Sequence, residues 1–143
     1  MTIINKKRKL ISRSVEETID HGVSFARDLV PGDIVYLSGE LGSGKTVFIK
    51  GICSGLGVMT EVTSPSFVIA TQYQGKLPVA HIDLYRLDVD GVRNLPLDDY
   101  LLSDGITVIE WAERVLDMLP GIMIRIEIVD QVTREISIED NRH

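Results

Sequence analysis

The sequence has little of what an exported, membrane-spanning or nucleic-acid-coating protein needs. Its single cysteine, Cys53, excludes an internal disulfide and favours a reducing compartment. No apolar run approaches the length of a membrane span, and the N-terminus lacks the apolar core of a signal peptide. Acidic residues outnumber basic ones, 21 to 15, and a net charge of −6 argues against broad binding to nucleic acid. We therefore expect a cytoplasmic protein that binds no membrane.

The length and composition are those of one globular domain. The chain has 143 residues, of which 44% are hydrophobic and 25% charged, so we expect a single domain over residues 1–143. One basic run, at residues 6–9, departs from the acidic average. Its two interpretations are a solvated chain end and a local nucleic-acid contact, and its position near the terminus favours the first.

Residues 39–46 carry the most informative motif. They read Gly-Glu-Leu-Gly-Ser-Gly-Lys-Thr and match G-x-x-x-x-G-K-[ST], the phosphate-binding P-loop. A β-branched run precedes the motif, and a helical pattern with apolar residues at 48, 49, 52 and 53 follows it. These flanks disfavour the alternative, a tight turn that carries a lysine by chance. The loop residues expected to contact a nucleotide are Glu40, Leu41, Gly42, Ser43, Gly44, Lys45 and Thr46.

The chemistry of the motif assigns roles to its last two residues. Glycines let successive backbone N–H groups face the phosphates, and the start of the following helix adds partial positive charge. Lys45 is expected to reach the β- and γ-phosphates, and the Thr46 hydroxyl to hold Mg²⁺. Because no Asn-Lys-x-Asp guanine signature occurs, ATP or ADP is the expected nucleotide.

Elsewhere the hydrophobic pattern predicts an α/β chain. Strands are predicted at residues 9–12, 34–37, 67–73, 77–84, 106–111, 122–129 and 133–138. Helices are predicted at residues 15–30, with Ser14 as N-cap, and at residues 47–53, 95–102 and 112–119. Two predicted hairpins make the sheet mixed. We therefore expect a three-layer, P-loop NTPase-like α/β fold with a mixed central sheet and a C-terminal β-hairpin.

Two carboxylates are candidates to complete the site. Asp83 and Glu110 each end an apolar strand, which is where ligand contacts gather in open α/β sheets. Each is a candidate for metal binding and catalysis beside Lys45 and Thr46, and the alternative for each is a surface acid at a strand end. The hydroxyl-rich residues 63–66 suit a switch that meets the γ-phosphate or Mg²⁺; the alternative is a serine-rich turn. Its candidate contacts are Thr63, Ser64 and Ser66.

Four stretches together resemble the TsaE (YjeE) family. They are the P-loop, Thr-Ser-Pro-Ser-Phe at 63–67, His-Ile-Asp-Leu-Tyr-Arg-Leu at 81–87 and Glu-Trp-Ala-Glu at 110–113. The resemblance implies a Mg²⁺-dependent ATPase, weak when alone, that is needed for threonylcarbamoyladenosine modification of tRNA. It also implies the TsaB–TsaD complex as partner, with tRNA contacted only indirectly.

The same resemblance implies residue roles. Lys45 and Thr46 would grip phosphate and Mg²⁺, Glu110 would be a second metal-associated residue, and Asp83 would be a metal-shell or catalytic carboxylate. Trp111 would shape the site or the partner surface, and the adenine would lie near Ser14 and Val15.

Two departures from the family pattern are present. Ser66 stands where threonine is more frequent, and residues 95–97 lack a glycine that often occurs there. A small-molecule kinase and an ADP-sensing interaction module remain as alternatives to the accessory ATPase.

Overall fold

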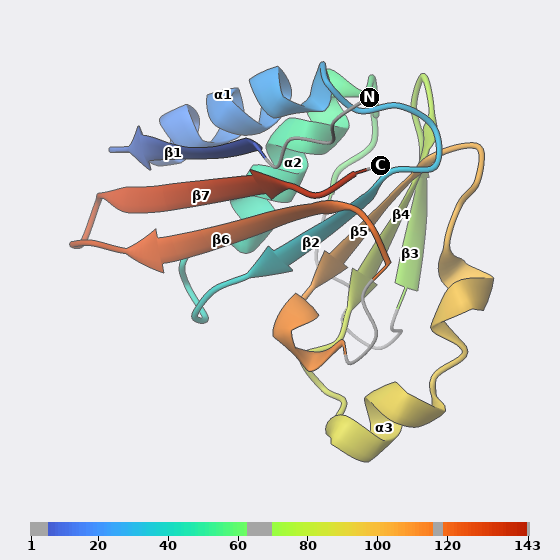
Figure 1. Cartoon of the computed structure of the whole chain (residues 1–143). Coiled ribbons are helices and arrows are strands. Elements are labelled where there is room, and N and C mark those ends of the chain that lie inside the picture. Colours follow the sequence, from blue (N-terminus) through green and yellow to red (C-terminus); the bar gives the residue numbers. More distant parts are fainter. Residues whose placement is uncertain (1–5, 63–69, 116–118, 143) are drawn as a thin grey trace.

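The computed structural model describes residues 6–62, 70–115 and 119–142. They form one seven-stranded sheet in the order β1-β7-β6-β2-β5-β4-β3 (Figure 1). The strands are β1 Lys6–Ser12, β2 Ile34–Ser38, β3 Ala70–Gln74, β4 Pro78–Asp83, β5 Ile106–Glu110, β6 Ile122–Ile128 and β7 Arg134–Asp140. The neighbours β6, β2, β5 and β4 pair in parallel, whereas the pairs β1–β7, β6–β7 and β3–β4 are antiparallel. The predicted mixed sheet and C-terminal hairpin are confirmed.

Two helices cover one face of this sheet (Figure 1). Helix α1 spans Val15–Ala26, and Ser14 caps it by accepting from the Glu17 N–H at 3.0 Å, as predicted. Helix α2 spans Lys45–Gly55, and its four predicted apolar positions are fully buried. Among them Cys53 lies in the core, where burial raises the pKa of its thiol to about 12. No helix among the described residues is both long and apolar enough to cross a membrane.

Close contact between α1 and α2 fixes the position of the second helix. Gly22 and Gly51 face each other at the crossing, and a Cβ added to Gly51 would collide with the Ile19 carbonyl oxygen. Only glycine therefore allows this approach of the two backbones. Since α2 begins at the P-loop, the crossing also sets where that loop lies relative to α1.

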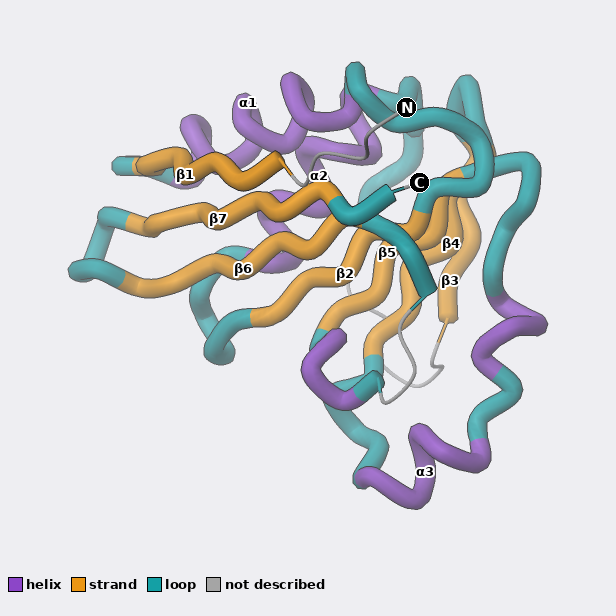
Figure 2. Tube along the Cα trace, viewed as in Figure 1, coloured by secondary structure: helices purple, strands orange, loops and turns teal. Residues whose placement is uncertain are grey.

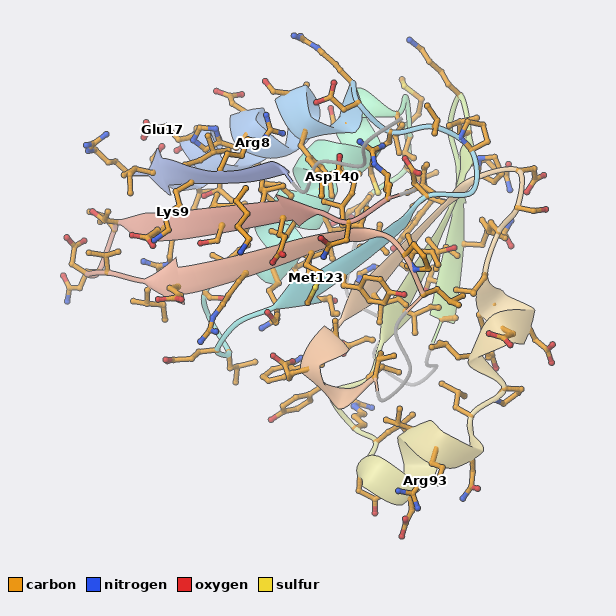
Figure 3. The ribbon with its side chains drawn as sticks, in the orientation of Figure 1. Arg8, Lys9, Glu17, Arg93, Met123 and Asp140 are labelled. Atoms are coloured by element: carbon orange, nitrogen blue, oxygen red, sulfur yellow. The ribbon has the colours of Figure 1, made fainter. Side chains whose placement is uncertain are left out.

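A third layer covers part of the opposite face. It contains helix α3, Val89–Asn94, and the 3₁₀ helices Leu97–Tyr100 and Ala112–Arg114. Val92 of α3 joins a second core cluster with Ile34, Ile82 and Ile109. The rest of this face, over β6, β7 and β1, carries exposed side chains such as Lys9 and Met123 (Figure 3). The predicted three layers are thus present over β2, β5 and β4.

Three predicted helices are wrong in extent. Helix α1 ends at Ala26 and not at residue 30, because the Asp28 and Leu29 N–H groups bond to carbonyl oxygens three residues back, in turns. In place of a helix over residues 112–119, Ala112–Arg114 form a single 3₁₀ turn and Val115 is extended (ψ 123°). Trp111 before it is left-handed (φ 60°), so the predicted strand also ends one residue early, at Glu110. Residues 95–102 do not form one helix. Helix α3 ends before them, and a 3₁₀ helix covers only Leu97–Tyr100, because Leu95 is held extended (ψ 127°) before a proline.

The basic run at residues 6–9 is part of a strand and not a loose chain end. It begins β1, which is longer than the predicted strand 9–12 and pairs along its whole length with β7. Lys7 and Lys9 lie 3.9 Å and 3.4 Å from Glu139 and Glu135 on that neighbouring strand. Acidic side chains therefore lie beside Lys7 and Lys9 on the exposed sheet face.

Candidate nucleotide-binding site

The carboxyl ends of three parallel strands meet beside the P-loop. Strand register places Glu110 next to Leu37 of β2 on one side and next to Asp83 of β4 on the other. The P-loop leaves the sheet after β2 and enters α2 at this same edge (Figure 2). Gly42 and Gly44 take positive φ values of 83° and 107°, which favour glycine over every L-residue. The motif glycines are therefore required by the loop's conformation.

Lys45 is held inside the loop. Its ammonium donates to the Gly39 and Glu40 carbonyl oxygens and lies 4.1 Å from the centroid of the Trp111 ring. Burial lowers the pKa of Lys45, and the nearby carboxylates of Glu110, Glu113 and Asp83 raise it. The Lys45 ammonium thus lies inside the loop, and its hydrogen-bond acceptors there are neutral carbonyl oxygens that an anion can replace.

A hydrogen-bonded chain links the P-loop to two strands. The Thr46 hydroxyl donates to Glu110 Oε1 at 3.3 Å, and His81 Nε2 lies 2.7 Å from Glu110 Oε2. Because a carboxylate only accepts, we assign the proton of this bond to Nε2. His81 is fully buried, Glu110 is 3% exposed, and His81 Nδ1 has no hydrogen-bond partner among the described residues. The carboxylate is therefore fixed between the helix and β4.

Asp83 lies beside this chain but is more open. Its carboxylate accepts from the Tyr85 N–H at 2.9 Å. Burial raises the pKa of Asp83, the Tyr85 hydrogen bond lowers it, and the neighbouring Glu110 raises it. The Tyr85 ring packs against Trp111 with centroids 4.9 Å apart. Asp83 is thus a carboxyl group whose surroundings favour the neutral form more than water does.

Two clefts flank the P-loop. The first, of about 430 Å³, is bounded by Lys45, Thr46, Asp83, Glu110 and Trp111. The second, of about 290 Å³, lies between the start of α1 and the turn that joins β6 to β7. Its lining residues include Ser14, Val15, Ser43, Gln131, Val132 and Arg134. Val15 and Val132 are 58% and 64% exposed, so this second cleft presents apolar side chains to solvent.

The predicted site residues fall into three groups. Lys45, Thr46, Asp83 and Glu110 line the first cleft together with Leu41, as their motif positions suggested. Val15 lies in the second cleft, which Gly42, Ser43 and Gly44 also line, and Glu40 is exposed at the loop tip. The switch candidates Thr63, Ser64 and Ser66 lie outside the described residues.

Two residues of the site received no role from the sequence. His81 stands in a quoted motif, and its position two residues before Asp83 places both on one face of β4, a signal that could have paired it with Glu110. Arg134 donates to the Ser43 and Gly42 carbonyl oxygens from 91 and 92 positions away. No local pattern could have found that contact.

The side chains present fit a phosphate and Mg²⁺. Ser43 Oγ is buried without a hydrogen-bond partner among the described residues, inside a loop whose motif binds phosphate. Nowhere in the described part of the chain do three His, Cys, Asp or Glu side chains form a group able to bind a metal by themselves. Thr46, Glu110 and Asp83 instead offer one hydroxyl and two carboxylates. That donor set suits Mg²⁺, which binds through one or two carboxylates together with substrate phosphates.

The fold and this site place the chain in the class of P-loop α/β proteins. The family model described as "Threonylcarbamoyl adenosine biosynthesis protein TsaE" matches residues 12–136. The chain belongs to the TsaE family.

Individual relatives agree with the family model. A tRNA threonylcarbamoyladenosine biosynthesis protein TsaE from Treponema pallidum is 36% identical over 133 residues, which cover 91% of this chain and 98% of that protein. The protein of that name from Bacillus subtilis is 42% identical over 99 residues, 68% of this chain and 62% of its own length. The crystal structure of Bacillus subtilis YdiB is similar to this one, with a TM-score of 0.80 and 32% identity over 98% of this chain and 89% of that one.

Proposed function

We propose that this chain is an accessory ATPase of tRNA threonylcarbamoyladenosine biosynthesis. The names of its relatives support the pathway. The observation that supports the ATPase is the hydrogen bond from the P-loop Thr46 to Glu110 at the end of the adjacent parallel strand. A hydroxyl and a carboxylate in that relation are what P-loop NTPases use to hold Mg²⁺ against a nucleotide.

The two clefts suggest how ATP or ADP would lie. The phosphates would occupy the first cleft, where Lys45 exchanges the Gly39 and Glu40 carbonyl oxygens for phosphate oxygens. The adenine would lie in the second cleft beside the exposed side chains of Val15 and Val132. Adenine has apolar faces, so burying them against two valines is favourable. The P-loop lies between the clefts and would contact the phosphates nearest to the adenosine.

Hydrolysis would use the residues of the first cleft. Water attacks the γ-phosphorus as the bond to the β–γ bridging oxygen breaks, giving ADP and phosphate. Bound Mg²⁺ would neutralise charge on the β- and γ-phosphate oxygens. Thr46 and Glu110 would hold it, with Glu110 kept in place by His81. Asp83 would orient the attacking water or accept a proton from it. Its raised pKa makes it a better proton acceptor than an ordinary aspartate.

The partner in this proposal is the TsaB–TsaD complex. Threonylcarbamoyl transfer would belong to that complex, and ATP hydrolysis by this chain would reset it between turnovers. The chain would contact tRNA only indirectly, as its net charge of −6 favours, and would work in the cytoplasm.

One assay separates this proposal from a small-molecule kinase and from an ADP-sensing module. ATP hydrolysis is measured with and without purified TsaB–TsaD, and the accessory ATPase predicts stimulation by the complex. Unstimulated hydrolysis, with a nucleotide affinity that the complex leaves unchanged, would contradict the proposal. A phosphorylated small-molecule acceptor would identify a kinase, and ADP binding without turnover would identify a sensor.

Two variants test the division of roles in the same assay. Lys45→Ala should weaken nucleotide binding, because it removes the phosphate-binding ammonium. Glu110→Ala should reduce turnover more than binding, because the P-loop itself stays intact. Equal losses of binding in both variants would show that this division is wrong.

A further inference from the structure

Arg134 joins the P-loop to the turn between β6 and β7. It is the first residue of β7, and its Nε and Nη2 donate to the Ser43 and Gly42 carbonyl oxygens at 3.1 Å and 3.4 Å. Its Nη1 donates to the Asp130 and Thr133 carbonyl oxygens at 2.8 Å and 3.1 Å. One guanidinium thus bonds to the P-loop and to the β6–β7 turn, and both line the second cleft.

The bonds to the P-loop act on the peptide groups next to two glycines. Ser43 stands between Gly42 and Gly44, both with positive φ, and glycine peptides reorient more easily than others. In a trans peptide the C=O points opposite to the N–H of the next residue. The Ser43 N–H donates to the Glu40 carbonyl oxygen at 3.0 Å within the loop. By holding the Ser43 carbonyl oxygen, Arg134 therefore directs the Gly44 N–H to the opposite side of the loop.

The donors of Arg134 are largely committed to backbone oxygens. A guanidinium has five N–H donors, and Arg134 makes four hydrogen bonds to carbonyl groups. An arginine that recognised a ligand directly would instead present two parallel donors to it. The bonding of Arg134 therefore points to a role in shaping the loop.

We propose that Arg134 is a positioning residue for phosphate binding. It fixes the Ser43–Gly44 peptide so that the Gly44 N–H faces the phosphate, and it keeps the β6–β7 turn at a set distance from the P-loop. This inference rests on the proposed function, because it assumes that nucleotide phosphates bind at the P-loop.

Binding measurements on Arg134→Gln and Arg134→Lys test the inference with two probes. The probes are MgADP and inorganic tripolyphosphate with Mg²⁺, which has phosphates but no base. Arg134→Gln should weaken both by a similar factor of about ten, equivalent to about 1.4 kcal/mol. The affinity of Arg134→Lys for both probes should lie between those of Arg134→Gln and the wild type, because one ammonium replaces some of the hydrogen bonds but lacks the planar fork of the guanidinium. The matched control is Arg125→Gln, which removes an exposed arginine of β6 that pairs with Glu127, and it should bind both probes as the wild type does.

Three results would overturn the inference, and they can be told apart. Weakened ADP binding with unchanged tripolyphosphate binding would show that Arg134 acts on the adenosine part of the nucleotide and not on the phosphates. Unchanged binding of both probes by variants of lowered thermal stability would make Arg134 a structural residue only. If the wild type binds neither probe, the proposed function fails and the inference fails with it. Should Arg134→Gln not fold, the lysine variant gives the same comparison.

Discussion

Replacing His81 by leucine tests the buried pair that fixes Glu110. His81 Nε2 and Glu110 Oε2 are 2.7 Å apart, and the two side chains are 0% and 3% exposed. Leucine has nearly the volume of histidine but cannot donate a hydrogen bond. The carboxylate would keep only Thr46, at 3.3 Å, of the two partners described above. Glutamine is the matched control, because its amide nitrogen can reach the position of Nε2.

The size of the effect follows from the bond that is lost. A hydrogen bond to a charged group contributes about 1.5–3 kcal/mol, and little cavity forms because the volumes are similar. His81→Leu should therefore lower the free energy of unfolding by about 2–3 kcal/mol and the melting temperature by about 6–10 °C. His81→Gln should lose less than about 1 kcal/mol, since it keeps a donor facing Glu110.

Urea unfolding of the three proteins measures the stability, and calorimetry measures the consequence for the site. With Glu110 no longer held, His81→Leu should lose much of the gain in ADP affinity that Mg²⁺ gives, while ADP affinity in EDTA changes little. Stabilities of His81→Leu and His81→Gln that agree within about 0.5 kcal/mol would show that the hydrogen bond between His81 and Glu110 contributes nothing measurable.

Three further predictions concern the same region. Burial raises the pKa of Asp83 above its unfolded value, so the ionised group costs stability at neutral pH; Asp83→Asn should be more stable at pH 7 by up to about 1 kcal/mol, and urea unfolding should show that gain vanish below about pH 4. Gly51→Ala should lower the free energy of unfolding by about 1–3 kcal/mol at the α1–α2 crossing, whereas Ser54→Ala, at an exposed position of α2, should change it little in the same urea titration. Titration with MgADP should raise the fluorescence emission of Trp111, the only tryptophan, because phosphate draws the Lys45 ammonium away from the Trp111 ring. Unchanged emission, despite binding measured by calorimetry, would contradict that movement.

Local pattern was enough to predict the elements that carry the site. The strand before the P-loop, the loop itself and the buried face of α2 depend on short-range periodicity and on glycine conformations. Asp83 and Glu110 could be predicted to lie together because parallel strands bring their carboxyl ends to one edge, and their register is now observed. Their roles stay a prediction until they are tested.

The misplaced elements show what local pattern cannot decide. The helix predicted over residues 112–119 has suitable periodicity, but a left-handed Trp111 and an extended Val115 limit it to one turn. Helix α3 had a local signal, since Asp88 accepts from the Gly91 N–H at 2.7 Å as an N-cap, but a short helix in a polar segment has little periodicity. Arg134 reaches the P-loop only through the packing of β7 in the sheet.

We propose above that the P-loop of this chain binds a nucleotide through Lys45. Calorimetric titration of the wild type and Lys45→Met with MgATP and MgADP tests it most directly. We expect one site per chain in the wild type and an affinity at least about tenfold weaker in Lys45→Met, since the Lys45 ammonium lies inside the loop and is the only side-chain cation of residues 39–46. Equal affinities in the two proteins, or no binding by a folded wild type, would contradict it.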